Sequence, residues 1–201
     1  MRKRMCVPMM TLCLLLTACG GAGEETGGAA EARLPYRDMA GCTMEATVSC
    51  DQDGALWQAD LRCEYVPEGE VAVEVLAPET IAGVRAVLSD GETALVYEDL
   101  CLNAGTLGSE EVSPMACLPR LMDALREGWL LEENQENWGE VPCVRLTVDQ
   151  TGGGGGKILS TLWLREADGT PLRGEIAVDG EIILTADFTS FSFYDTIQDQ
   201  E

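Results

Sequence analysis

The sequence contains no histidine in its 201 residues. Histidine is the most frequent general base, the usual partner of a nucleophilic serine or cysteine, and the commonest metal ligand. Its absence argues against triad hydrolases and against most zinc sites. Acidic residues are abundant, and pairs of them do not distinguish a glycosidase site from ordinary surface charge. We therefore expect a protein that is not an enzyme.

Motifs for binding metals and nucleotides are also missing. The sequence has no CxxC pair and no twelve-residue calcium loop. The glycine run at 152–156 precedes Lys157, but Thr151 stands where a phosphate loop has glycine, and Ile158 stands where it has serine or threonine. The sequence therefore predicts no metal, no nucleotide and no other cofactor.

Basic residues are scarce, because 13 Lys and Arg face 35 Asp and Glu, for a net charge of −22. Three of the 13 are Arg2, Lys3 and Arg4 at the N-terminus. If residues 1–18 are removed, ten bases remain against 35 acids and the net charge becomes −25. Such a chain is repelled by nucleic acid and by anionic lipid headgroups. We expect no nucleic acid partner, and contact with the membrane through an anchor alone.

No apolar run reaches the roughly 18 residues that a transmembrane helix needs. The N-terminus instead has three basic residues, a short apolar segment and small residues before Cys19, in "LTAC". That order is typical of a secretory signal peptide. "LTAC" also resembles the lipobox of bacterial lipoproteins, which implies that residues 1–18 are removed and that Cys19 carries a diacylglyceryl group and acyl chains such as palmitate. The alternative is a plain secretory signal with an incidental thiol.

The segment after Cys19 is rich in glycine, alanine and glutamate and has no apolar periodicity. We interpret residues 19–33 as the lipidated cysteine and a flexible tether, with a root-mean-square reach of roughly 20 Å. Residues 34–196 are then a single domain, long enough for one core, and residues 197–201 are a C-terminal tail. These boundaries predict a domain held by a lipid anchor at the extracytoplasmic face of the cell membrane.

Alternation of apolar and polar residues predicts a fold built mainly of antiparallel strands. The expected strands are 42–50, 57–65, 70–75, two strands within 85–99, one near 100–107, and 141–149, 157–165, 171–179 and 181–193. From Ser113 to Gly128 the apolar residues recur at intervals of three and four residues, which predicts a helix with Pro114 in its first turn. The stretch 129–140 reads as a loop or a short helix. The predicted fold class is α+β.

Six cysteines follow Cys19, and an even number in an exported domain favours disulfides. A turn centred on 52–53 would place Cys42 opposite Cys63, within reach of a disulfide, whereas a two-residue turn at 53–54 would place Met44 opposite Cys63. The first arrangement makes Cys42 and Cys63 the disulfide candidates. The alternative is that some thiols are free and buried in the core. The pairing is open among Cys42, Cys50, Cys63, Cys101, Cys117 and Cys143.

The expected inward faces of the first hairpin and the helix are apolar. An ordinary core under a helix fits this lining, and so does an open concave face with a cavity for an acyl chain, since small residues at facing positions would leave room. The cavity-lining candidates are Met44, Ala46, Val48, Trp57, Ala59, Leu61, Leu118, Met122 and Leu125.

The order of these features resembles that of a known family. A lipobox, a tether, a long first hairpin, the stretch "VAVEVLAPETIAGVRAVLSDGETALVYED", a helix opening with "SPM" and the closing "LWLREADGTPLRGEIAVDGEIILTADFTSFSF" are similar to the Lol-type (LolA/LolB-like) half-barrel lipoproteins. The plan is nearest to anchored Gram-positive members such as the clostridial spore germination lipoproteins. The resemblance implies a strongly curved antiparallel sheet, a half-barrel, with helices packed on its concave side.

The resemblance also implies two functions. One is a membrane-anchored module that binds a lipid or the acyl chain of a lipoprotein in an apolar cavity. The other is a non-enzymatic interaction protein that holds or regulates a cell-envelope enzyme, as the germination lipoproteins do with a cell-wall amidase. No binding residue carries over, because the resemblance lies in the order of elements and not in an invariant motif.

Overall fold

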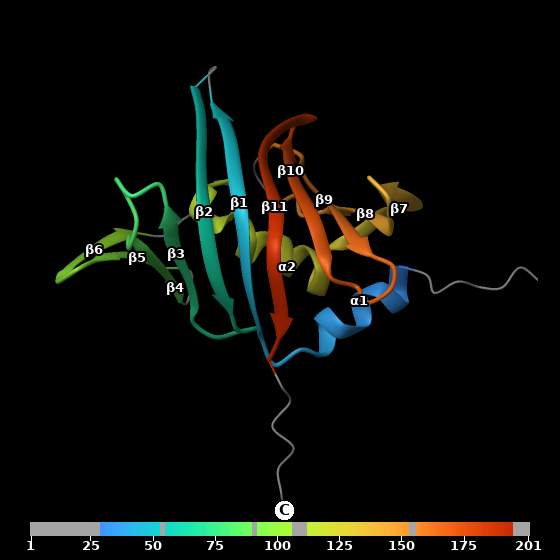
Figure 1. The fold of residues 1–201 in the computed structure, drawn as a ribbon, viewed down its shortest axis with the longest axis horizontal. Helices are drawn as coiled ribbons and strands as arrows, with labels where there is room; N and C mark the ends of the chain where they lie inside the picture. Colours follow the sequence, from blue (N-terminus) through green and yellow to red (C-terminus); the bar gives the residue numbers. More distant parts are fainter. Residues whose placement is uncertain (1–28, 53–54, 90–91, 106–111, 153–155, 195–201) are drawn as a thin grey trace, which may run out of the picture.

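The computed structural model describes residues 29–52, 55–89, 92–105, 112–152 and 156–194. The predicted signal segment 1–18, Cys19 and the tail 197–201 lie outside these residues. The described chain forms one large sheet and two α-helices (Figure 1). The elements are α1 (Ala29–Asp38), β1 (Cys42–Gln52), β2 (Ala55–Tyr65), β3 (Val71–Ala77), β4 (Arg85–Ser89), β5 (Glu92–Tyr97), β6 (Leu100–Gly105), the 3₁₀ turn η1 (Pro114–Ala116), α2 (Cys117–Glu127), β7 (Trp129–Trp138), β8 (Val141–Asp149), β9 (Ile158–Arg165), β10 (Pro171–Val178) and β11 (Glu181–Phe193).

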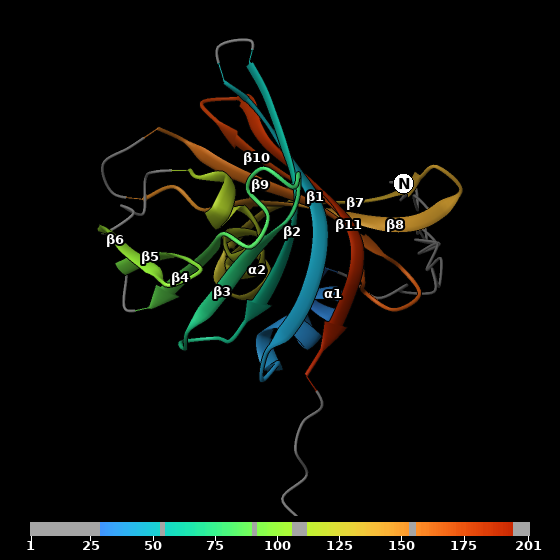
Figure 2. The same ribbon diagram turned by 60° about the vertical axis from the view of Figure 1, so that its left-hand side comes forward.

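The sheet has eleven strands in the order β6-β5-β4-β3-β2-β1-β11-β10-β9-β8-β7, and every neighbouring pair is antiparallel. The first and last strands of the chain, β1 and β11, pair at its centre, while β6 and β7 are its two edges. The sheet curves around α2 without closing (Figure 2). The predicted class is confirmed: an α+β fold with a strongly curved antiparallel sheet of the half-barrel kind.

The first hairpin pairs in the second of the two expected registers. Met44 lies opposite Cys63, and Cys42 lies opposite Tyr65. The last pair joins Gln52 to Ala55, which leaves two residues between the strands, the connection that an Asp-Gly pair favours. The register that made Cys42 and Cys63 disulfide candidates was therefore wrong, and both are free thiols in the structure.

The strand β7 corrects a second expectation, because 129–140 was predicted to be a loop or a short helix. β7 pairs with β8 along its whole length. It is an edge strand, and all its side chains except Leu130 are exposed. A strand with no buried face has no reason to alternate apolar and polar residues, so the signal used for the other strands is absent here.

The helix predicted near 113–128 is present in two parts, η1 and α2. Ser113 makes no capping hydrogen bond with its side chain, and the α-helix itself begins only at Cys117. Pro119 lies in its first turn, where the backbone N–H has no intrahelical partner. The helix ends at Glu127 with Gly128 as its C-cap.

Helix α1 moves the start of the folded domain. It begins at Ala29, so residues 29–33, assigned to the flexible tether, are helical. Arg33 is 3% exposed and Tyr36 is fully buried. The tether prediction failed here because the contacts that order this helix come from α2 and from the β9–β10 turn, which are far away in sequence. No helix in the described part of the chain is long and apolar enough to cross a bilayer.

Candidate functional site

The concave side of the sheet is filled by α2. Four of its side chains, Leu118, Leu121, Met122 and Leu125, are fully buried against the sheet. Strand β10 makes room for the helix at Gly174, where an added Cβ would lie 2.4 Å from Leu121 Cδ1. A helix that approaches a sheet this closely occupies the space in which a cavity was expected.

The structure brings the nine predicted cavity-lining residues together in one core cluster. Trp57 is half-buried at its margin, and the other eight are at most 2% exposed: Met44, Ala46, Val48, Ala59, Leu61, Leu118, Met122 and Leu125. Their role in binding an acyl chain stays a prediction. With α2 in this position, they pack as an ordinary core does.

Four of the six thiols belong to the same core: Cys42, Cys50, Cys63 and Cys117. Burial raises the pKa of Cys42 and of Cys117 to about 12, and it raises the pKa of Cys63 well above its usual range. A thiol in this state is protonated at neutral pH and is a poor nucleophile and metal ligand. The described residues contain no group of three or more Cys, Asp and Glu side chains placed to hold a metal ion.

Arg33 holds α1 against the end of α2. Its guanidinium donates hydrogen bonds to the carbonyl oxygens of Leu125 at 2.7 Å, Ala124 at 3.0 Å and Gly128 at 2.9 Å. These carbonyls belong to the last helical turn and the C-cap, at the negative end of the helix dipole; that of Ala124 also accepts the Gly128 N–H. The buried positive charge is thus compensated by α2.

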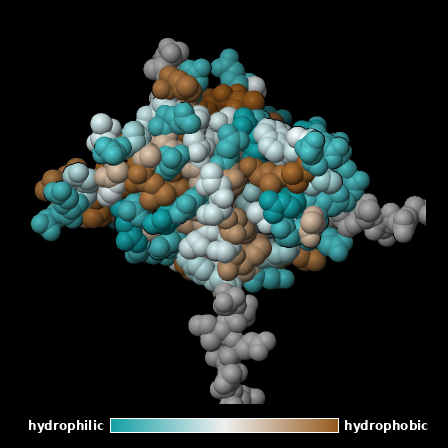
Figure 3. Space-filling view, in the orientation of Figure 1, coloured by the Kyte–Doolittle hydropathy of each residue, from teal (hydrophilic) through white to brown (hydrophobic). Residues whose placement is uncertain are grey.

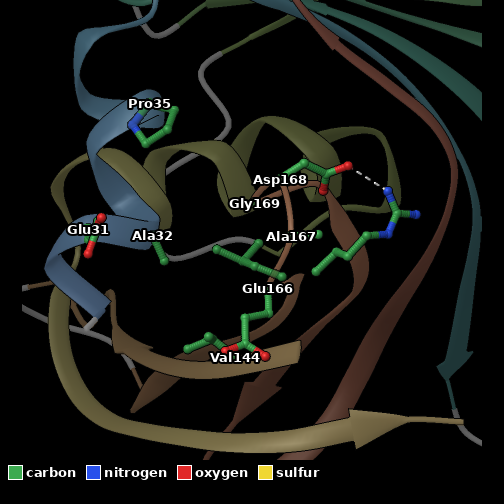
Figure 4. A pocket seen from close by; sticks show the side chains of 10 residues that line it. Glu31, Ala32, Pro35, Val144, Glu166, Ala167, Asp168 and Gly169 are labelled. Atoms are coloured by element: carbon green, nitrogen blue, oxygen red, sulfur yellow. Dashed lines mark hydrogen bonds and ion pairs between the residues drawn. The ribbon is translucent and has the colours of Figure 1, made fainter. Parts of the chain in front are cut away.

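A pocket of about 240 Å³ lies between α1, β8 and the β9–β10 turn (Figure 4). Its lining is Glu31, Ala32, Pro35, Val144, Leu164 and residues 165–169. Two of its charged residues, Arg165 and Asp168, are paired at 2.9 Å, and hydrogen bonding to Thr170 together with this pair holds the pKa of Asp168 below its usual range. The carboxylates of Glu31 and Glu166 also line the pocket, which is smaller than the roughly 300–1,000 Å³ of typical ligand sites.

The face of the sheet away from α2 carries a network of charges and indole rings. The guanidinium of Arg173 lies 5.3 Å from the ring of Trp138 and pairs with Glu175 at 2.9 Å and Asp187 at 2.7 Å. The indole N–H of Trp163 donates to Glu136. Every charge of this network that could act on a ligand already has a partner, so the network serves to hold β7, β9, β10 and β11 together.

Exposed apolar side chains gather at both edges of the sheet. Figure 3 shows hydrophobic residues among hydrophilic ones at the end formed by β4, β5 and β6, where Tyr97, Leu100 and Leu102 are 44%, 66% and 66% exposed. At the other edge, Trp129 is 76% exposed at the start of β7. The sequence reasoning missed Trp129 and Arg33, because each lies in an element that it did not predict.

Comparisons with known proteins agree with this fold. No protein-family model and no curated protein matches the sequence. Among solved structures, an uncharacterised conserved protein from Thermus thermophilus matches with a TM-score of 0.50 at 16% identity, over 83% of this chain and 88% of that one. A putative outer membrane lipoprotein-sorting protein domain from Vibrio parahaemolyticus gives a TM-score of 0.47 at 10% identity, over 85% and 93% of the two chains.

A third match is to the structure of the CwlD amidase from Clostridioides difficile in complex with the GerS lipoprotein, with a TM-score of 0.38 at 12% identity over 82% of this chain and 87% of that one. At these identities the likeness is one of fold.

Proposed function

We propose that this protein is a lipoprotein of the cell membrane, anchored through Cys19 on the extracytoplasmic face, and that its domain binds another molecule and is not an enzyme. The signal-like N-terminus and "LTAC" support the anchor.

Binding of another cell-envelope protein is the function that the geometry supports best. The observation behind it is the position of α2, whose apolar face fills the concave side of the sheet with fully buried side chains. Because the interior of the half-barrel is filled, a partner can bind only at the outer surface of the domain. That surface is strongly acidic, with ten bases against 35 acids in the chain after Cys19, so a basic partner is favoured. A cell-wall enzyme, as in spore germination, is the partner class that the sequence resemblance suggests.

Binding of an acyl chain is the second candidate, and one observation favours it. The concave face under α2 is lined by apolar side chains. Movement of α2 away from the sheet would therefore expose an apolar groove. This function requires α2 to move, because no acyl chain fits among side chains that are at most 2% exposed.

Native mass spectrometry of residues 20–201 expressed in a bacterium, followed by organic extraction, distinguishes the two candidates. We expect an empty, folded domain, with a protein partner recovered by cross-linking in the producing cell. Bound lipid near one equivalent would overturn the first candidate and favour the second. In that case Trp57→Glu, a change at the half-buried margin of the apolar cluster, should reduce the bound lipid while the domain stays folded.

The anchor needs a separate measurement on the full-length chain. We expect the mature protein to begin at Cys19 with the mass of a diacylglyceryl group, and to fractionate with membranes. The variant Cys19→Ala should be unmodified and should lose this fractionation. An unmodified Cys19 in the natural protein would contradict the anchor.

A further inference from the structure

One corner of the molecule combines exposed apolar side chains with a cation. Leu34 of α1 and Trp129 and Leu131 of β7 are 50%, 76% and 43% exposed. Arg37 lies on α1 one turn after Leu34 and is exposed as well. We call these four residues the corner surface.

The corner surface is continuous across two elements. Arg33, Arg37 and Trp129 line one pocket of about 340 Å³, together with Glu127, Gly128 and Leu130. Leu131 follows two residues after Trp129 at the bulge in β7.

The position of the corner surface relative to the N-terminus is rigid. Helix α1 begins on the β7 and β8 side of the sheet (Figures 1 and 2), and Arg33 fixes it there through three hydrogen bonds to the end of α2. The hydroxyl of Tyr36 adds a fourth, donated to the Gly169 carbonyl at 2.5 Å. The corner surface is therefore held beside the start of α1, the point at which the chain leaves the domain toward Cys19.

The chain between Cys19 and α1 is short. Ten residues, 19–28, precede Ala29, and a chain of that length spans at most about 35 Å in any conformation. With the lipid at Cys19, the start of α1 and the surface beside it stay close to the bilayer.

We propose that the corner surface rests on the lipid bilayer, an inference that depends on the proposed anchor at Cys19. Tryptophan is favoured at the depth of the headgroups, leucine partitions into the adjoining acyl region, and arginine binds phosphate. Arg37 has no ion-pair partner within the described residues, so its charge is available to a headgroup. The net charge of −25 predicts that the body of the domain is held off anionic lipid, and only this corner breaks that rule.

The test attaches the protein to a membrane without using Cys19. Residues 20–201 with an N-terminal hexahistidine tag are bound to vesicles of phosphatidylcholine that contain a nickel-chelating lipid, with and without phosphatidylcholine brominated near the headgroup end of its acyl chains. Bromine quenches tryptophan fluorescence on contact. We expect quenching in the wild type, loss of most of it in Trp129→Phe, and retention in Trp138→Phe.

Trp138 is the matched control because it is an exposed tryptophan at the far end of the same strand, about 30 Å away at the usual rise of a strand. The double variant Leu34→Glu, Leu131→Glu keeps Trp129 and should lose quenching too, since two charges replace the apolar contacts.

Equal quenching in wild type and Trp129→Phe, or no quenching in any vesicle-bound form, would overturn the proposal. Because the tag supplies the attachment, these results are independent of whether Cys19 is lipidated. An unmodified Cys19 in the natural protein would overturn the anchor, whereas quenching at Trp129 would still show that the corner surface contacts lipid when the N-terminal side of the domain is held at a bilayer.

Discussion

Arg33 connects the two helices, because it lies on α1 and donates hydrogen bonds to the end of α2. It is buried, and its three hydrogen bonds satisfy carbonyls at the end of α2. A cation in this place is stabilised by the dipole of the helix that it caps. Sequence alone assigned this arginine to a tether, because a single charged residue in a stretch of glycine, alanine and glutamate carries no sign of burial.

Arg33→Ala should lower the free energy of unfolding by about 2–3 kcal/mol, since charge-assisted hydrogen bonds are lost and buried carbonyls are left without partners. Arg37→Ala, one turn later and exposed, should change it by less than about 0.5 kcal/mol. Urea unfolding followed by circular dichroism measures both. Equal effects of the two substitutions would mean that the contacts of Arg33 with α2 do not stabilise the fold.

The thiols should differ sharply in reactivity. Cys101 is exposed, whereas the other five cysteines of the domain are buried, and burial raises the pKa of Cys42 and Cys117 to about 12. We expect one thiol of folded residues 20–201 to react quickly with iodoacetamide at pH 8. In the variant Cys101→Ser, no thiol should react quickly. Raising the pH to 9 should not make Cys42, Cys63 or Cys117 reactive, because burial holds the pKa of each well above that pH. Mass spectrometry of the alkylated protein counts the sites, and a disulfide between Cys42 and Cys63 would appear as two missing thiols after denaturation.

At the scale of elements, α2 decides what the half-barrel contains. The apolar face of α2 could be predicted because its apolar residues recur at intervals of three and four residues. The alternation of apolar and polar residues in β1 and β2 likewise predicted which face of the sheet packs against the helix. The distance between α2 and the sheet could not be predicted from the sequence, because it depends on Gly174, a strand residue about fifty positions further along the chain. A glycine in a strand marks a close approach only when the approaching element is known.

Gly174→Ala should destabilise the protein by about 1–3 kcal/mol through overpacking, because the new Cβ would lie 2.4 Å from Leu121 Cδ1. In Leu121→Ala the same substitution should cost less, so the two changes should be non-additive in a double-mutant cycle. Chemical unfolding of the four proteins gives the coupling. Additive effects would place α2 further from β10 than the structure has it.

At the scale of the whole molecule, charge governs the encounter with a partner. The chain after Cys19 carries a net charge of −25, and five of its ten bases form ion pairs in the described structure, for example Arg62 with Glu45 at 2.8 Å. The exposed pairs contribute little to stability, but they leave the acidic residues in excess over the surface as a whole.

Association with the partner recovered by cross-linking should therefore slow about tenfold between roughly 0.05 and 0.5 M salt, as electrostatic steering is screened. Surface plasmon resonance with residues 20–201 immobilised measures this dependence. An association rate that does not change with salt would contradict recognition of the acidic surface by a basic partner.

The sequence by itself determined the strands that have one buried face, the central helix and the α+β class, and it carries the motif on which the proposed anchor at Cys19 rests. Each of these follows from a local pattern: apolar residues that recur every two residues in a strand or every three to four residues in a helix, or a short motif. Tertiary structure alone decided the hairpin register, the order in α1, the edge strand β7 and the filling of the concave side. The physical reason is the same in each case: the partners that settle these features, Tyr65 for Cys42, the end of α2 for Arg33, β8 for β7 and Gly174 for Leu121, are brought together only when the sheet folds around α2.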